Sequence, residues 1–85
     1  MPARRTSPSA QRALGRAIRE LRTEQGKSQE AIALDAQMQP SWLSHIEAGR
    51  RNPAWSTVQR IAVALNVRVS DLARRAEELE GSEET

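Results

Sequence analysis

The chain has 85 residues, enough for one small domain, and its apolar fraction of 38%, charged fraction of 28% and net charge of +2 are typical of a globular protein. It contains no cysteine and one histidine, which excludes a disulfide framework and a thiolate metal site and leaves no ligand set for zinc. No apolar run approaches the roughly 18 residues of a membrane span and no hydrophobic segment follows the first arginines, so we expect a cytoplasmic protein without a secretory signal.

The first predicted helix follows a short arm. Residues 1–8 contain two prolines and two arginines and are predicted to form a flexible basic arm. Ser9 is expected to cap the helix, because its hydroxyl can accept hydrogen bonds from the free N–H groups of the first turn. The apolar positions that recur at helical spacing are Leu14, Ile18 and Leu21. Gly26 closes this helix at the left-handed position just past its last turn.

Two shorter helices are predicted in the middle of the chain. Ser28 can cap the first of them, which spans about residues 28–36. After a break of only a few residues, 37–39, Pro40 stands at the first position of the next helix, where the missing proline N–H does no harm. Gly49 ends this third helix.

Two more helices complete the predicted domain. A basic loop at residues 50–53 leads to a fourth helix over about residues 54–65, with Trp55 among its inward-facing residues. Asn66 is a suitable left-handed cap for this helix. Ser70 is expected to cap a fifth helix. Five helices with short connections predict an all-α fold.

Charge is distributed unevenly along the chain. Residues 1–75 hold all 13 Lys and Arg residues against six acidic ones, a net charge of +7, whereas residues 76–85 hold five acidic residues and no base, a net charge of −5. A basic body indicates a polyanionic partner, although charges that only keep a small domain soluble would look the same. We therefore predict a folded domain over residues 9–80 and an acidic, disordered tail over residues 81–85.

The second and third predicted helices have the pattern of a helix-turn-helix. Two short helices joined by three or four residues must cross closely, which suits the small Ala33, and the second must present short polar groups at its start. The segments SQEAIA at 28–33, WLSHIEAGRRNP at 42–53 and IAVALNV at 61–67 resemble the Cro/CI-type (XRE) helix-turn-helix family. The resemblance covers about residues 13–73. It implies a five-helix, lambda-repressor-like domain that binds operator DNA, usually as a symmetric dimer, without a cofactor or catalytic activity.

Three residues depart from the family pattern. Gln37 stands where the family often has glycine in the turn, which predicts a strained or slightly different turn. Lys27 replaces a common apolar residue, and Pro40 replaces a polar residue that often contacts DNA. None of these changes breaks the core pattern.

The resemblance also assigns roles to individual residues. Those expected to read base edges are Gln39, Ser41, Ser44 and His45. Those expected to contact the DNA backbone are Gln29 (as a phosphate clamp), Trp42, Arg50, Arg51 and Asn52. Arg22 and Glu47 correspond to the family's charged pair, which would orient the third helix on the first. Alternatives stay open: a predicted reader could touch only phosphate or water, and Trp42 could pack on the second helix. Arg4 and Arg5 could reach a minor groove or belong to a disordered tail.

Four apolar residues are candidates for a two-fold dimer interface: Val67, Val69, Leu72 and Leu79. Val69 and Leu72 could instead belong to the chain's own core.

The overall prediction is a homodimeric transcriptional regulator, a repressor or autoregulator, that binds a palindromic site in double-stranded DNA. Two alternatives stay open: an antitoxin or restriction–modification controller protein of the same fold, with a possible partner protein, and a protein–protein adaptor that binds no DNA. An enzyme is not expected, because no nucleophile–base pair, carboxylate pair or glycine-rich phosphate loop is present.

Overall fold

The computed structural model describes residues 8–84, with side chains up to Ser82, and this part of the chain forms five α-helices and no strand. In chain order the helices are α1 (Pro8–Glu24), α2 (Gln29–Asp35), α3 (Pro40–Glu47), α4 (Trp55–Ala64) and α5 (Val69–Glu84). The all-α prediction is confirmed. Residues 1–7 of the predicted arm, which include Arg4 and Arg5, lie outside the described residues. None of the described helices is both long and apolar enough to cross a membrane.

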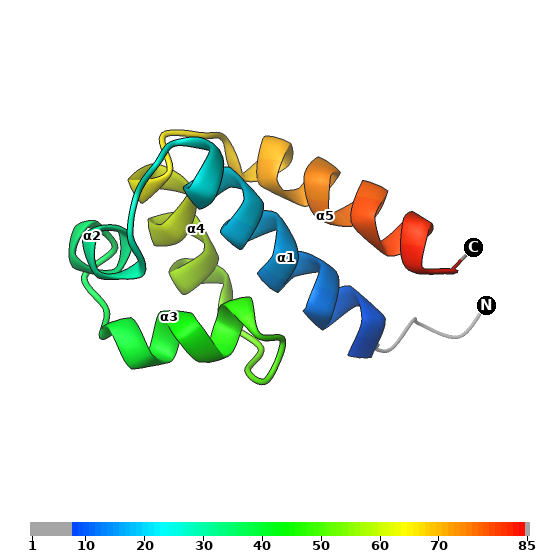
Figure 1. Ribbon diagram of the computed structural model, residues 1–85, viewed down its shortest axis with the longest axis horizontal. Coiled ribbons are helices and arrows are strands. Elements are labelled where there is room, and N and C mark those ends of the chain that lie inside the picture. Colours follow the sequence, from blue (N-terminus) through cyan, green and yellow to red (C-terminus); the bar gives the residue numbers. More distant parts are fainter. Residues whose placement is uncertain (1–7, 85) are drawn as a thin grey trace.

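The two longest helices, α1 and α5, lie side by side and antiparallel, so the first turn of α1 is near the last turns of α5 (Figure 1). Helix α3 crosses below α1, and α2 and α4 lie together near the C-terminal end of α1 (Figure 1). Arg75 on α5 donates hydrogen bonds to Glu24 (2.7 Å) and Glu20 (3.2 Å) on α1. The bond from Arg75 lowers the pKa of Glu24 below its ordinary value.

One hydrophobic core joins all five helices. The largest fully buried side chains are Ile18, Ile32, Leu43, Ile46, Ile61, Leu65 and Leu72. Each of the five helices contributes at least one of these side chains. Burial of a side chain of this size stabilises the fold by about 1.5–3 kcal/mol. The prediction that Trp55 faces inward is wrong: its side chain is 63% exposed. Trp55 is the first residue of α4, and the buried residues of this helix begin only at Ile61.

Helices α1 to α4 all end in the same way, with one residue in the left-handed conformation. These residues are Gly26, Gln37, Gly49 and Asn66, with φ of 68°, 58°, 76° and 57°. The residue after each donates its N–H back to a carbonyl five positions earlier, as in Arg50 N to His45 O (2.9 Å). The left-handed positions at the two glycines and the asparagine were predicted from the sequence. Gln37 was noted only as a departure from the family pattern, which often has glycine in this turn. Its positive φ agrees with the expected strain, because glycine adopts such a conformation without strain and glutamine does not.

The helix starts follow the predictions less closely. Ser28 caps α2 by accepting a hydrogen bond from Ala31 N (3.1 Å), and Pro40 is the first residue of α3, both as predicted. The caps predicted at Ser9 and Ser70 are wrong, because α1 begins at Pro8 and α5 at Val69. Ser9 instead donates its hydroxyl to Glu80 Oε2 on α5 (3.2 Å). Helix α5 continues to Glu84, past the glycine at which we expected the chain to fray.

Candidate nucleic-acid interface

Helices α2 and α3 meet at a tight turn that fixes which side of α3 is exposed. Ala33 on α2 is fully buried, so the two helices approach closely, and its carbonyl accepts a hydrogen bond from Met38 N (2.9 Å) in the turn. Leu43 and Ile46 bury the inner side of α3. The predicted base-reading residues, which are all exposed, are Gln39, Ser41, Ser44 and His45. The structure therefore presents short polar side chains along the outer side of α3.

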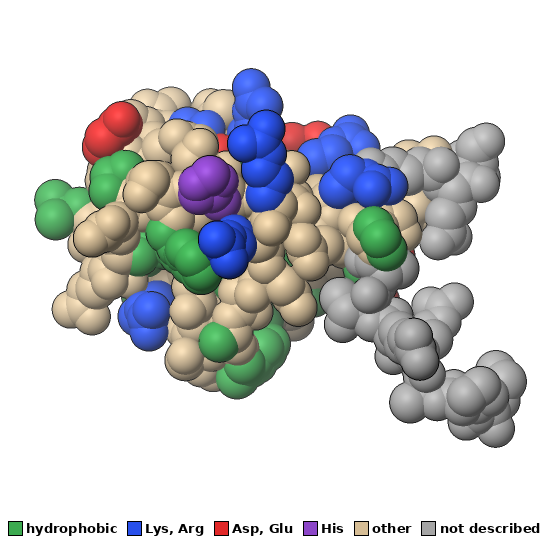
Figure 2. Space-filling model, turned by 90° about the horizontal axis from the view of Figure 1, so that it is seen from below, with side chains coloured by type: hydrophobic (Ala, Val, Ile, Leu, Met, Phe, Trp, Pro, Cys, Tyr) green, Lys and Arg blue, Asp and Glu red, His purple; other side chains and the backbone are tan. Residues whose placement is uncertain are grey.

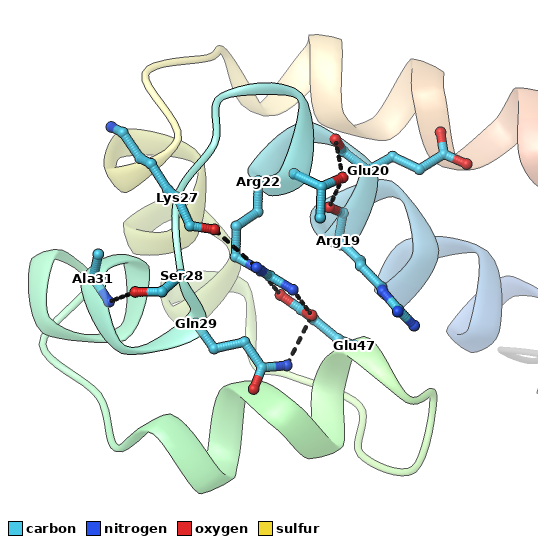
Figure 3. Close-up of polar contacts among 9 residues, drawn as sticks. Arg19, Glu20, Arg22, Lys27, Ser28, Gln29, Ala31 and Glu47 are labelled. Atoms are coloured by element: carbon cyan, nitrogen blue, oxygen red, sulfur yellow. Dashed lines mark hydrogen bonds and ion pairs between the residues drawn. The ribbon is translucent and has the colours of Figure 1, made fainter.

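A buried polar cluster orients α3 on α1 (Figure 3). The Glu47 side chain is only 3% exposed, and its carboxylate accepts hydrogen bonds from Arg22 Nε (2.8 Å) and Nη2 (3.0 Å). Arg22 also donates Nη1 to the Lys27 carbonyl (2.8 Å). Hydrogen bonding to Glu47 raises the pKa of the Arg22 guanidinium above its ordinary value, so Arg22 stays charged. Gln29, the predicted phosphate clamp, donates Nε2 to Glu47 Oε1 (2.9 Å) in the isolated chain.

The C-terminal end of α3 lies directly against the backbone of α1 at Gly15. A Cβ atom added to Gly15 would collide with the Ile46 carbonyl oxygen and lie 2.6 Å from that of Glu47. Close by, Gln11 donates Nε2 to the Gly49 carbonyl (2.7 Å). This contact was not predicted, although a glycine between the apolar positions of a predicted helix was the available signal.

The loop after α3 carries the predicted backbone-binding residues Arg50, Arg51 and Asn52, and all three are exposed. The guanidinium of Arg51 lies over the Trp42 ring, 5.4 Å from the ring centroid, in the range of a cation–π contact. Trp42 is 39% exposed, so part of its ring stays accessible beside Arg51. The ring therefore positions one of the two loop arginines at the edge of α3.

Helix α1 adds basic residues that sequence analysis did not assign to a site. Arg12, Arg16 and Arg19 are exposed and follow one another at spacings of four and three residues, so they form one stripe on the helix. Arg12 neighbours Gly49, and Arg19 shares a pocket with Ser44, so both ends of the stripe border the α3 region. In the view from below, basic side chains lie to the right of the histidine and below it, and apolar and uncharged groups lie to its left (Figure 2).

The predicted dimer residues are packed within the chain to different degrees. Leu72 is fully buried, so it belongs to the chain's own core, the alternative that the sequence left open. Val67, Val69 and Leu79 are partly buried against the same core. The position of a dimer interface stays a prediction. Leu34 on α2 is 78% exposed.

A short helix with a buried inner side and a polar outer side, held beside a basic loop by a preceding short helix, defines a helix-turn-helix protein. The chain belongs to the helix-turn-helix domain family, whose model matches residues 13–76. The Cro/CI-type fold predicted from the sequence is confirmed, because the same residues form the matched helices.

Known relatives agree with this assignment. The HTH-type transcriptional regulator DdrOP3 of Deinococcus deserti is 40% identical over 60 residues, which cover 71% of this chain and 46% of that protein. The chain thus spans about half the length of this relative. The restriction-modification controller protein C.AhdI of Aeromonas hydrophila is 33% identical, with a TM-score of 0.70 over 72% of this chain and 92% of that one. The clp gene regulator ClgR of Corynebacterium glutamicum is 26% identical, with a TM-score of 0.85 over 87% of this chain and 79% of that one.

Proposed function

We propose that this protein is a DNA-binding transcriptional regulator that inserts α3 into the major groove of a specific site. The observation that carries the proposal is the outer side of α3, where exposed polar residues stand beside a basic loop while the opposite side is buried. The relatives named as a transcriptional regulator, a controller protein and a gene regulator support it. A controller protein of a restriction–modification operon is one such regulator and stays a narrower form of the same proposal.

DNA binding would use two kinds of contact, one to base edges and one to backbone phosphates. Gln39 and His45 carry groups that can bond to base edges in the major groove. The small Ser41 side chain, which lies between them in the sequence, allows α3 to approach the bases closely. Arg50 and Arg51 contact phosphates, which contribute affinity without sequence preference. The first set therefore determines which site is bound, and the second determines how strongly binding depends on salt.

Replacing Arg50 and Arg51 together by alanine tests the proposal. Two lost phosphate contacts should reduce the slope of log affinity against log salt by about 1.8 and weaken binding equally on all sequences. Fluorescence anisotropy with duplexes selected from a random pool measures both quantities. Arg74→Ala is the matched control, because Arg74 is an exposed arginine on α5 and should leave the slope unchanged. Absence of salt-dependent binding by the wild type would exclude DNA binding and favour the adaptor alternative.

We further propose that two copies of the chain form the DNA-binding unit, and that they meet at Trp55. This exposed side chain borders an apolar groove of about 430 Å³, and the other apolar residues that line it are Ala10, Leu14, Pro53, Val58, Val69, Leu72, Ala73 and Ala76. A two-fold axis here would place Trp55 of each copy over the groove of the other. A buried tryptophan contributes about 150–250 Å² of contact area, and a chain of this size gains stability from a partner. Such a pair could place two α3 helices about 34 Å apart, one turn of DNA.

Trp55→Ser is expected to dissociate this dimer. A tryptophan at the centre of an interface typically contributes about 2 kcal/mol or more, so the dimer dissociation constant should rise about 30-fold. Sedimentation equilibrium over a range of protein concentrations measures it. Leu34→Ser is the matched control, since Leu34 is an even more exposed apolar residue on α2 and does not line the groove. A monomeric wild type, or equal dimer affinity for wild type and Trp55→Ser, would contradict the interface.

A further inference from the structure

The basic loop at residues 50–53 begins at the peptide group that joins Gly49 to Arg50, and both polar atoms of this group are hydrogen-bonded. Arg50 N donates to the His45 carbonyl of α3 (2.9 Å), and the Gly49 carbonyl accepts from Gln11 Nε2 of α1 (2.7 Å). A peptide group is planar, so hydrogen bonds at its two ends fix the orientation of the whole unit. The direction in which the chain enters the loop is therefore set by α1 and α3 together.

Helix α1 also packs directly on Gly49. A Cβ atom added to Gly49 would lie 2.9 Å from Arg12 Cγ and 3.1 Å from Arg12 Cα. The φ of Gly49 is 76°, a conformation that glycine adopts without strain. Two successive residues of α1 thus hold the start of the loop, Gln11 by a hydrogen bond and Arg12 by packing.

The part of α1 that carries Gln11 is itself anchored. Gln11 lies near the start of α1, which begins at Pro8, and the first turn of a helix tends to fray because its N–H groups have no partner within the helix. Here Ser9 donates its hydroxyl to Glu80 Oε2 (3.2 Å) on the neighbouring last turns of α5 (Figure 1). The matched family range begins only at residue 13, so this bracket of Ser9 and Gln11 lies outside it.

The two arginines of the loop are held by different means. The guanidinium of Arg51 lies over the Trp42 ring, which restrains its side chain directly. Arg50 is exposed, and the fixed element next to it is the peptide group that Gln11 holds. A long side chain binds a phosphate more tightly when its backbone is already fixed, because groups that become immobilised on binding cost free energy.

We propose that Gln11 is a positioning residue for DNA binding, which fixes the Gly49 carbonyl and thereby directs Arg50 toward the backbone of the duplex. The inference rests on the proposed function, because it needs the contact between Arg50 and a phosphate. Gln11 carries no charge, so it acts through the loop and not by attracting DNA.

Gln11→Met tests the proposal, because methionine has a similar length and no N–H to donate. The variant should bind DNA about three- to tenfold more weakly, and by the same factor on every sequence, since a phosphate contact carries no sequence preference. Its slope of log affinity against log salt should fall toward that of Arg50→Ala, a change of at most about 0.9. Fluorescence anisotropy over a range of salt concentrations, with selected and unselected duplexes, measures both quantities.

Gln25→Met is the matched control. Gln25 follows the other end of α1, and its Nε2 donates to the Leu65 carbonyl (2.6 Å), a bond of the same kind as that of Gln11. Each variant loses one such bond, so both should lower the melting temperature by a similar amount, about 4–8 °C. Only Gln11→Met should lose affinity for DNA, which separates positioning from a contribution to stability alone.

Two further measurements trace the effect to Arg50. In a background of Arg50→Ala, Gln11→Met should cause no further loss of DNA affinity, because the side chain that it positions is gone. In the free protein, the backbone order parameter of Arg50 from nitrogen-15 relaxation should fall from about 0.85 toward about 0.6 in Gln11→Met. It should stay at the wild-type value in Gln25→Met.

Two results would overturn this role of Gln11. One is equal DNA affinity for Gln11→Met and Gln25→Met while Arg50→Ala binds more weakly than the wild type; this result leaves the proposed function intact. The other is the same loss from Gln11→Met with and without Arg50, which would mean that Gln11 acts on another part of the surface. Failure of the wild type to bind any duplex would instead overturn the proposed function, and the role of Gln11 with it, even with the expected change in the order parameter.

Discussion

Gly15→Ala is expected to lower the free energy of unfolding by about 3 kcal/mol, at the upper end of the cost of overpacking a core. The added Cβ atom would overlap the carbonyl oxygens of Ile46 and Glu47. Both atoms belong to the backbone of α3, so no side-chain rotation can relieve the overlap. The two helices must separate, and the melting temperature should fall by more than about 10 °C. Thermal unfolding followed by circular dichroism measures this change.

The direction of this effect is informative because helix propensity predicts the opposite. Alanine is favoured over glycine inside a helix by about 1 kcal/mol, and Gly15 lies in the middle of α1. Gly81→Ala on α5 is the matched control: a Cβ there has nothing within 4 Å, so stability should be unchanged or slightly raised. If Gly15→Ala were as stable as Gly81→Ala, the close approach of α1 to α3 would be wrong.

Much of the fold could be predicted because helix boundaries here have local chemical causes. The Ser28 cap, Pro40 at a first helical position and Asn66 at a left-handed position each act within a few residues, so the sequence reveals them. Gln37 was harder to predict, because glutamine has no preference for positive φ and adopts it only when packing of the two flanking helices requires it. Trp55 was assigned to the core from helical spacing alone. Spacing identifies one side of a helix, not whether its first turn reaches the core.

The candidate site also contains features that the sequence predicted and features that only the structure shows. The pairing of Arg22 with Glu47 was implied by the family resemblance, and the structure shows the two in contact. The bond between Gln29 and Glu47 joins residues 18 positions apart on different helices, and no local pattern indicates it. Arg19 looks like any solvated arginine in the sequence. It lines a pocket between α1 and α3, a placement that the sequence alone does not reveal.

Glu47→Ala is expected to reduce the free energy of unfolding by about 3–5 kcal/mol, the usual cost of removing one partner from a buried ion pair. The change would leave Arg22, whose side chain is only 12% exposed, as an uncompensated charge, and would also remove the acceptor of Gln29. A loss of this size is a large fraction of the stability of a small domain. Urea denaturation followed by circular dichroism measures it. Arg74→Ala, which breaks a 3.8 Å pair between side chains 70% and 50% exposed, is the matched control and should cost about 0–1 kcal/mol.

A double substitution separates the contribution of this pair to stability from its contribution to orientation. Replacing Arg22 by methionine and Glu47 by leucine removes both charges and fills similar volume, so much of the lost stability should return. DNA affinity should not return with it, because apolar contacts do not fix the direction of α3 as two charged hydrogen bonds do. A Glu47→Ala variant as stable as Arg74→Ala would show that the pair is not buried. Wild-type DNA affinity in the double variant would show that core packing alone sets the orientation of α3.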